Sequence, residues 1–225
     1  MENIMGNEYL YERFEFTDEY KNDIIEMLRH NTNVEIGGHK FFDGQRTHLM
    51  QSPWELADFI FELKKHENNT RNKLDSFLEV GFATGANNSV INKFFNFKRI
   101  VGLDLFSGTG NADSLVGNMI HKNLTLICGN TRSNYVIESA KKLGPYDLIF
   151  IDADHTYEGV KLDFKNYLPM LSEGGVIGFH DVECPDWPGI NEFWTELQST
   201  NKYNMQKFVK KGFLLQYGIG MLTLK

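Results

Sequence analysis

Short apolar runs alternate with segments of helical periodicity from residue 76 to the end of the chain. The runs cover 77–81, 100–105, 124–128, 148–151 and 176–179, and the helical segments between them cover about 87–97, 110–121, 132–143 and 156–171. A helix beginning at Pro188 and two further strand-like runs, 203–209 and 213–224, complete the pattern. Alternation of this kind is typical of a parallel β-sheet with helices on both faces. We therefore expect an α/β domain over 76–225.

The first 75 residues are less regular, and we expect them to form a helical and loop extension. Residues 17–30 place apolar side chains on one face of a helix. The sequence Ser52-Pro53-Trp54-Glu55 predicts a second helix running to about His66, with Ser52 as N-cap and Glu55 closing a capping box. The glycine-containing segment 31–50 indicates a long loop, and we expect it to act as a lid over a ligand cleft.

Composition narrows the class of protein. The chain is 41% hydrophobic and 24% charged, as in an ordinary globular domain. It has no apolar run of about 18 residues and no signal peptide, and its two cysteines make no disulfide framework, so we expect a cytoplasmic protein that does not bind membranes. With 23 basic and 30 acidic residues the net charge is −7, which argues against nucleic acid as a partner. The oligomeric state has no signal in the sequence.

Small polar turns follow the first three apolar runs. Glu79, Gly81 and Gly85 surround a strand-to-helix turn that lacks the middle glycine of the nicotinamide-binding fingerprint. Asp104 ends the second run, where an acid typically binds ribose hydroxyls, and Gly129-Asn130-Thr131 follows the third. Ligands of doubly wound sheets lie at such strand ends, so these turns predict a nucleoside-like ligand. Each turn alone is also compatible with tight packing or capping.

These residues resemble the cofactor-binding series of class I S-adenosylmethionine-dependent methyltransferases. The likeness continues through residues 150–163, 171–181 and 188–194. In these segments the chain is similar to the small-molecule and sugar O-methyltransferases related to macrocin O-methyltransferase and, more distantly, to cephalosporin hydroxylase-type proteins. It implies a Rossmann-like doubly wound sheet of seven strands in the order 3-2-1-4-5-7-6, with only strand 7 antiparallel. The first 50 residues have no counterpart in the resemblance.

The resemblance also implies where the cofactor lies. The amino-acid end of S-adenosylmethionine would lie near Glu79 and Gly81, the ribose on Asp104, and the adenine near 129–131. The cofactor-binding residues implied are Glu79, Gly81, Thr84, Gly85, Asp104, Gly129, Asn130, Thr131 and Asp152. The chain departs from the family pattern at Asn130, where an Asp is frequent, and at His180-Asp181, where some relatives have two acids.

Carboxylates and imidazoles gather at two further strand ends. Asp152, Asp154 and His155 follow the fourth run, while His180 and Asp181 follow the fifth. Neighbouring strands lie about 4.8 Å apart, so these side chains would share one rim, where close carboxylates favour a bound cation. Oxygen ligands with an imidazole suit Mg²⁺ or Mn²⁺. By the resemblance, the metal ligands are Asp152 and Asp181, with His180 as a further candidate.

The same cluster indicates a reaction. A hydroxyl group is a weak nucleophile that must lose its proton as it takes the methyl group, and a metal ion and a histidine base would both help. His155 occupies the position of the base in macrocin-type relatives, and with Asp152 it is our candidate catalytic residue; the other interpretation of His155 is a helix-start hydrogen bond. We therefore expect methyl transfer to a hydroxyl of a small molecule or sugar with divalent-metal assistance. Alternatives are a metal-independent or hydroxylase-like enzyme of the same fold, and a non-catalytic nucleotide-binding subunit.

For several other residues the sequence favours structural roles. We expect Asp147 and Asp163 to be capping residues or to form surface ion pairs, and Trp187 and Trp194 to be packing residues rather than platforms for a ligand. Cys128 is expected to be a small buried apolar residue.

Overall fold

The main element of the fold is a seven-stranded mixed sheet with the strand order β5-β4-β3-β6-β7-β9-β8. The structure is a computed structural model that describes residues 10, 13–31, 40–42, 45–47, 49–107, 123–211 and 217–225. The strands are β3 (Ser76–Val80), β4 (Arg99–Asp104), β5 (Leu124–Cys128), β6 (Tyr146–Ile151), β7 (Leu171–Phe179), β8 (Tyr203–Phe208) and β9 (Ile219–Leu224). Strands β3 to β7 pair in parallel and β9 is antiparallel to both its neighbours. When β3 is counted as strand 1 of the sheet, this is the predicted order 3-2-1-4-5-7-6, which is therefore confirmed.

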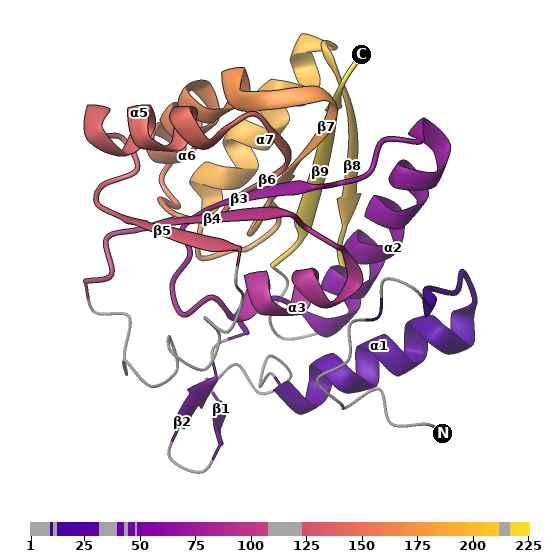
Figure 1. Ribbon diagram of the computed structural model, residues 1–225. Coiled ribbons are helices and arrows are strands. Elements are labelled where there is room, and N and C mark those ends of the chain that lie inside the picture. Colours follow the sequence, from indigo (N-terminus) through magenta and orange to yellow (C-terminus); the bar gives the residue numbers. More distant parts are fainter. Residues whose placement is uncertain are drawn as a thin grey trace.

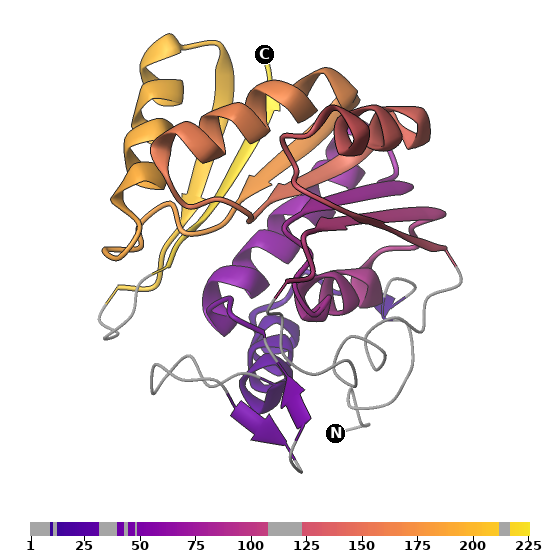
Figure 2. The ribbon, with the colours of Figure 1, turned by 90° about the vertical axis from the view of Figure 1, so that its left-hand side faces the viewer.

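Helices cover both faces of this sheet (Figure 1). One layer consists of α5 (Asn134–Leu143), α6 (Tyr157–Tyr167), the short 3₁₀ helix Leu168–Met170 and α7 (Pro188–Thr200). The opposite layer consists of α1 (Asp18–Asn31), α2 (Pro53–Thr70) and α3 (Ala86–Phe94). Seen from the side in Figure 2, the two layers enclose the sheet. The doubly wound α/β class is therefore confirmed.

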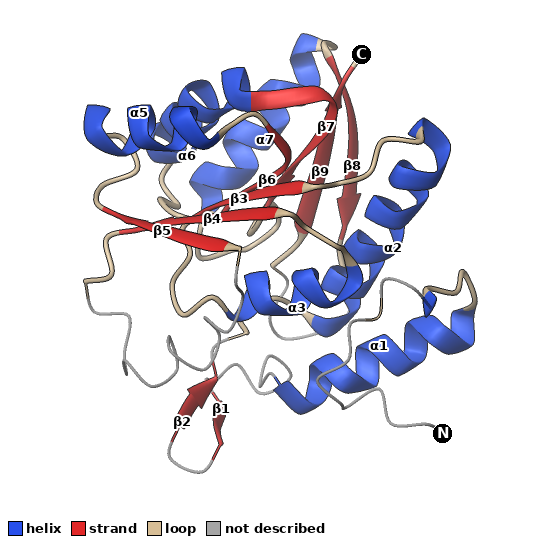
Figure 3. Cartoon of the chain, viewed as in Figure 1, coloured by secondary structure: helices blue, strands red, loops and turns tan. Residues whose placement is uncertain are grey.

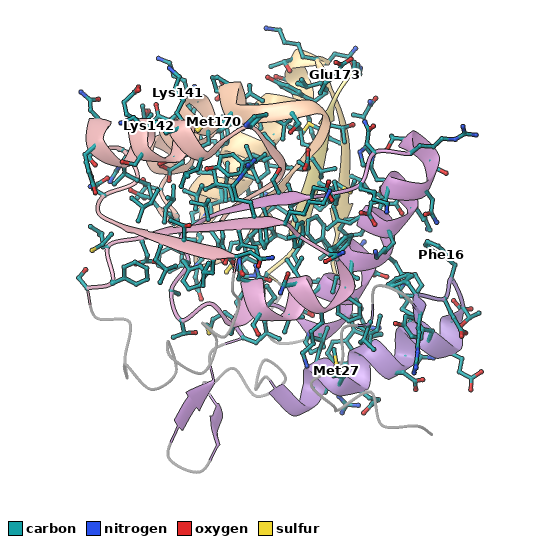
Figure 4. All side chains as sticks on the ribbon, viewed as in Figure 1. Phe16, Met27, Lys141, Lys142, Met170 and Glu173 are labelled. Carbon is teal, nitrogen blue, oxygen red and sulfur yellow. The ribbon has the colours of Figure 1, made fainter. Side chains whose placement is uncertain are left out.

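Alternate residues of each strand supply two separate cores. Phe77 and Phe150 pack toward α1, α2 and α3, whereas Leu78 and Ile151 pack toward α5, α6 and α7. Figure 4 labels a buried methionine from each side: Met27 on α1 and Met170 beside α6. Because the strands are apolar on both faces, they read as continuous hydrophobic runs in the sequence, as expected for a covered parallel sheet.

The N-terminal extension contains a short hairpin in addition to its helices. Strands β1 (Lys40–Phe42) and β2 (Gln45–Thr47) pair antiparallel within the segment expected to be a loop (Figure 3). The rest of the proposed lid at 31–50, apart from Asn31, Leu49 and Met50, lies outside the described residues. Helices α1 and α2 share a core with the sheet. The boundary between 1–75 and 76–225 stays a prediction.

Several element boundaries differ from those expected. Helix α2 continues to Thr70, four residues beyond His66, and α6 ends at Tyr167, so that Leu171 begins β7 rather than ending a helix. The helix expected over 110–121 lies outside the described residues. Among the helices that the structure does describe, none combines the length and apolarity that crossing a bilayer requires.

Helix α2 begins at the expected residue, but without the expected capping hydrogen bonds. Ser52 is the N-cap and Pro53 the first helical residue, yet the Ser52 side chain makes no capping hydrogen bond. Glu55 is 1% exposed, and its carboxylate accepts hydrogen bonds from the backbone N–H groups of Lys210 and Gly218. The capping box is therefore wrong: Glu55 instead ties the start of α2 to the two sides of the β8–β9 connection.

Candidate active site

A cavity of about 510 Å³ opens where the parallel strands end. The carboxyl ends of β3, β4, β5 and β6 lie side by side there because the four strands run in the same direction. Six of the residues predicted from the sequence line the cavity: Gly81, Asp104, Asn130, Thr131, Asp152 and His155. The other predicted residues, Glu79, Thr84, Gly85, Gly129, His180 and Asp181, are not among its lining residues.

The first glycine turn brings two strand ends together. Gly81 has a φ of +93°, and a Cβ atom there would collide with the carbonyl group of Asp152. The N–H group of Asp152 in turn donates to the carbonyl of Val80 at 2.7 Å. Gly85 has a φ of +76° and makes room for the ring of Phe82. The turn and its conformation are as predicted, while contact of these glycines with a cofactor stays a prediction.

Glu79 lies beneath this turn, with 1% of its surface exposed. One carboxylate oxygen accepts a hydrogen bond from the Asn87 amide at 2.7 Å. Burial raises the pKa of Glu79 to about 8. A buried acid that lacks a basic partner holds its proton at neutral pH, and a cationic ligand beside it would favour the ionised form.

Asp104 organises the second turn at the end of β4. Its two carboxylate oxygens accept backbone hydrogen bonds, one from Ala83 at 2.7 Å and one from Phe106 at 2.8 Å. Each carboxylate oxygen can accept more than one hydrogen bond. The side chain is therefore fixed at the cavity wall with acceptor capacity left for a pair of ligand hydroxyls.

The third turn, Gly129-Asn130-Thr131, is held from behind by two buried polar side chains. Thr131 donates its hydroxyl to Asp163 at 2.8 Å, and its carbonyl accepts from the hydroxyl of Tyr167 at 2.5 Å. Asp163 is fully buried, so the expectation of a cap or a surface ion pair is wrong. Burial raises the pKa of Asp163 to about 6. Asp147, by contrast, accepts from the backbone at the start of β3, as expected of a capping residue.

The carboxylate–histidine cluster consists of Asp152, His155, His180 and Asp181. Nε2 of His155 lies 3.0 Å from Oδ2 of Asp181 and 3.4 Å from Oδ1 of Asp152. Nδ1 of His180 lies 3.3 Å and 3.4 Å from the same two oxygens. The sequence-based expectation that these strand ends share one rim is thus confirmed by their geometry. Their roles in catalysis and metal binding stay predictions.

Charges within the cluster compensate one another. Burial disfavours the charged imidazole of His155, but hydrogen bonds to Asp152 and Asp181 outweigh burial and raise the pKa of His155 to about 9. The same opposition of burial and nearby carboxylates raises the pKa of His180. Burial alone would raise the pKa of Asp152 and of Asp181, yet the imidazoles lower both. The two carboxylates therefore favour the protonated form of both imidazoles.

Residues from two other parts of the chain support the cluster. The Gln51 side chain, 3% exposed, donates to the second carboxylate oxygen of Asp152 at 3.1 Å. The ring of Tyr217, in the β8–β9 connection tied down by Glu55, lies 5.7 Å from the ring of His180. Asp181 itself has a φ of +60°, a conformation that Asp and Asn tolerate better than most residues.

Trp187 and Arg132 are among the cavity residues that the sequence reasoning missed. Trp187 is 45% exposed and stacks on His155 with ring centroids 4.8 Å apart, so it is not an interior packing residue, whereas Trp194 is. Arg132 lines the cavity and forms a 3.0 Å ion pair with Asp154. Nothing in the local pattern marks these positions, because loop residues lack periodicity. Cys128 is also exposed rather than buried.

The residues present fit both groups that the sequence implied. One donor atom each from Asp152, His155 and Asp181 lie within 4.8 Å of one another, and such oxygen and nitrogen atoms are metal ligands. Asp104, at the cavity wall, has acceptor capacity suited to ribose hydroxyls, and Glu79, beneath the first turn, is a buried acid suited to a cationic group.

The comparisons with known proteins agree with this geometry. Residues 78–182 match the family model of a methyltransferase domain. A viral relative, the uncharacterized protein R132 of Acanthamoeba polyphaga mimivirus, is 26% identical over 160 residues, which cover 66% of this chain and 72% of that protein.

Solved structures extend the similarity to the whole fold. An O-methyltransferase from Bacillus cereus in complex with SAH matches with a TM-score of 0.58 at 16% identity, covering 96% of both chains. The MycE methyltransferase from the mycinamycin biosynthetic pathway, in complex with Mg and SAH, matches with a TM-score of 0.52 at 17% identity, covering 76% of this chain and 54% of MycE. Residues 78–182 therefore resemble a methyltransferase domain, and the chain has the fold of the class I S-adenosylmethionine-dependent methyltransferases.

Proposed function

We propose that this protein transfers the methyl group of S-adenosylmethionine to a hydroxyl group of a small molecule or sugar, with assistance from a divalent cation. The observation that carries the proposal is the position of the carboxylate–histidine cluster at the end of the cavity. Asp152 and His155 belong to both. A cofactor seated on the strand ends would therefore have an ionised cluster beside it.

The cofactor would use the three turns in the order in which they occur. Glu79 and the Gly81 turn would hold its amino-acid end, Asp104 its ribose and 129–131 its adenine. The SAH bound in the Bacillus cereus enzyme supports this assignment at the level of the shared fold. A positively charged amino or sulfonium group near Glu79 would replace the proton that this acid otherwise holds.

The transfer itself is a displacement at carbon. The bond from the sulfonium sulfur to the methyl group breaks, a bond from the acceptor oxygen to the same carbon forms, and the hydroxyl proton leaves to a base. His155, the cluster imidazole that lines the cavity, would accept that proton once a cation bound at Asp152 and Asp181 offsets the carboxylates that raise its pKa and so favours the neutral ring. Asp181, 3.0 Å from its Nε2, would stabilise the resulting imidazolium.

A divalent cation would be held by Asp152, Asp181 and His180, and Mg²⁺ and Mn²⁺ are the ions expected from the sequence. When bound, it would lower the pKa of the acceptor hydroxyl and orient it. Mg in the MycE complex supports this part of the proposal. The metal-independent alternative has its own support, because the two imidazoles already balance the two carboxylates.

The rival without catalysis is a nucleotide-binding subunit. Such a subunit has no use for two carboxylates and two imidazoles brought within 3.0–3.4 Å of one another beside its ligand. The acceptor is proposed to be a small molecule rather than nucleic acid, because the chain has a net charge of −7.

Calorimetric titration with SAH tests the cofactor. We expect wild-type protein to bind, and Asp104→Ala to bind about 10- to 100-fold more weakly, since a ribose acceptor is lost. Binding of ATP or NAD in place of SAH and S-adenosylmethionine would overturn the assignment.

Methyl transfer from radiolabelled S-adenosylmethionine to a panel of sugars and phenols tests the reaction. With any accepted hydroxyl, His155→Ala should lower the rate by about 10²–10⁴, the range for a lost general base. His66→Gln is the control, because this histidine contacts the carbonyl of Gly174 and does not line the cavity. Equal rates for wild type and His155→Ala would contradict the role given to His155.

A further inference from the structure

Two kinds of contact hold the imidazole of His155. Its Nε2 atom faces carboxylate oxygens of Asp152 and Asp181, at 3.4 and 3.0 Å. One face of its ring lies against the indole of Trp187, with the ring centroids 4.8 Å apart and the ring planes 23° from parallel. His155 and Trp187 both line the cavity. The base of the proposed reaction is thus packed against an aromatic side chain at the place where an acceptor would approach it.

The two contacts constrain different motions of the ring. Nε2 of a histidine lies close to the line that continues the Cβ–Cγ bond, so contacts at Nε2 hardly resist rotation of the ring about that bond. This torsion is broad for histidine when nothing packs against the ring. A quarter turn of the His155 ring would push its edge into the indole, because the two rings already lie face to face. The stack therefore fixes the plane of the imidazole, which the carboxylates alone do not.

We propose that Trp187 is a positioning residue for the methyl transfer. It keeps the imidazole of His155 in the one orientation in which the ring both contacts the carboxylates and lines the cavity. The role of Trp187 rests on the proposed function, because it acts through the base of that reaction. The stack itself rests on the structure alone.

The starts of two helices bring these two rings together. His155 directly precedes Thr156, the N-cap of α6, and Trp187 is itself the N-cap of α7. The two helix starts touch through their backbones, since a Cβ atom on Gly189 would lie 2.4 Å from the backbone nitrogen of Tyr157. Only a glycine at this position allows so close an approach. Residues 32 positions apart in the sequence therefore meet at a fixed distance.

A second set of contacts further along the helices holds α7 against α6. Lys161 of α6 donates to both carboxylate oxygens of Glu196 of α7, at 2.9 and 3.0 Å, and to the hydroxyl of Tyr157 at 2.8 Å. Tyr157 donates to the same carboxylate, and its ring packs edge-on against Phe193. Trp187 therefore cannot leave His155 unless the start of α7 separates from α6.

The exposure of Trp187 distinguishes it from a core residue. It is 45% exposed, whereas Trp194, on α7 itself, is 1% exposed and packs against Phe179. Substitutions at exposed positions usually change the free energy of unfolding little. Replacement of Trp187 should therefore release the ring of His155 without unfolding the domain, which separates a positioning role from a structural one.

The first test needs no acceptor and uses NMR of the full-length protein with labelled histidine. The ring protons of His155, identified by their absence in His155→Ala, should be shifted upfield by the ring current of the indole. Trp187→Ala should abolish the shift, and Trp187→Phe should retain part of it. Tyr135→Ala is the control, because it removes an aromatic side chain of α5 that is 70% exposed and does not line the cavity.

The second test is a double-mutant cycle on the rate of methyl transfer. With any hydroxyl that the protein accepts, Trp187→Ala should lower kcat by about 10- to 100-fold, because a small misplacement of a reacting group is costly. The KM for S-adenosylmethionine should stay within about threefold, and Trp187→Phe should recover most of the loss. In the His155→Ala background, Trp187→Ala should cause no further loss, because the two residues act as one unit.

Three results would overturn the role given to Trp187. Ring protons of His155 that are unshifted in the wild type, or a shift that survives Trp187→Ala, would show that the stack does not form in solution. Losses that add in the double variant would show that Trp187 acts independently of His155, as a wall of the acceptor pocket would. Failure of the wild type to bind SAH would instead refute the proposed function, and it would leave the NMR result unchanged.

Discussion

Carboxyl groups on two neighbouring strands have opposite protonation behaviour. Glu79, near the end of β3, holds its proton because burial raises its pKa to about 8. Asp152, which follows β6, is partly buried, with 16% of its side chain exposed, and the imidazoles of His180 and His155 lower its pKa. Strands β3 and β6 are adjacent in the sheet, with Glu79 opposite Phe150. The two acids thus lie near adjacent strand ends but differ in exposure and in their partners.

The difference shows which of the two acids a positively charged ligand group would affect more. The cluster half already contains basic groups, and its negative charge is compensated within the protein. The Glu79 half has amide donors only, of which Asn87 is the direct hydrogen-bond partner. A positively charged ligand group would therefore change the protonation of Glu79 far more than that of Asp152.

Removing an acid from the carboxylate–histidine cluster should have the largest effect on stability. Asp181→Asn keeps a residue that tolerates the φ of +60° but removes one of the two carboxylate charges that face both imidazoles. We expect the free energy of unfolding in excess chelator at pH 7 to fall by about 3–5 kcal/mol, because a buried charge loses its partner. Urea unfolding followed by circular dichroism measures this change.

Asp186→Asn is the matched control for Asp181→Asn. Asp186 lies in the same loop and is exposed, so its substitution should change the free energy of unfolding by no more than about 0.5 kcal/mol. If both variants lose the same small amount, the imidazoles do not depend on Asp181 and the comparison between the two halves fails.

Removing the acid Glu79 should raise the free energy of unfolding rather than lower it. The folded state holds the Glu79 proton up to about pH 8, whereas an unfolded glutamate releases it near pH 4.5. Wild-type stability therefore falls as pH rises between these values. Glu79→Gln, which can still accept from Asn87, should raise the free energy of unfolding at pH 7 by about 1–3 kcal/mol. Urea unfolding between pH 5 and pH 8 checks this, and parallel curves for the two proteins would contradict it.

The strands and the turns at their ends could be predicted because their signals are local. Apolar runs 77–81 and 148–151 lie within one residue or two of β3 and β6, and the acids that follow them are adjacent in sequence. The contacts of Gln51 with Asp152 and of Trp187 with His155 join residues 101 and 32 positions apart, and no local pattern encodes them. The strand order came from the resemblance rather than from periodicity.

One missed residue did carry a local signal. Asp163 lies three residues after Val160 and four before Tyr167, on the face of α6 whose apolar side chains are buried. Helical periodicity alone therefore placed it in the interior. Aspartate is usually exposed, which favours a surface role against this pattern. The partner that permits the burial of Asp163 is Thr131, which is 32 positions away.

The smallest effect is expected at Asp163. Like Glu79, it has no basic hydrogen-bond partner among the described residues, but the charge of Arg132 partly offsets the rise that burial causes in its pKa. Because its pKa is about 6, the stability that it removes is lost between about pH 4 and pH 6 and stays lost above pH 6, whereas the loss for Glu79 extends over a wider range. Asp163→Asn should raise the free energy of unfolding by about 1–2 kcal/mol above pH 6 and leave it unchanged below pH 4. Glu158→Gln, exposed on the same helix, is the control for urea unfolding.

The same position separates the charge of Asp163 from its acceptor oxygen. Asparagine can still accept from the hydroxyl of Thr131, so Asp163→Asn should bind SAH with wild-type affinity. Leucine has no acceptor, and Asp163→Leu should release the 129–131 turn and weaken SAH binding by about tenfold, roughly 1.4 kcal/mol. Equal SAH affinity for the two variants would show that Tyr167 alone, through its hydroxyl on the carbonyl of Thr131, holds the turn. A loss in both would mean that the negative charge itself acts on the ligand, and Asp163 would then belong with Asp152 rather than with Glu79.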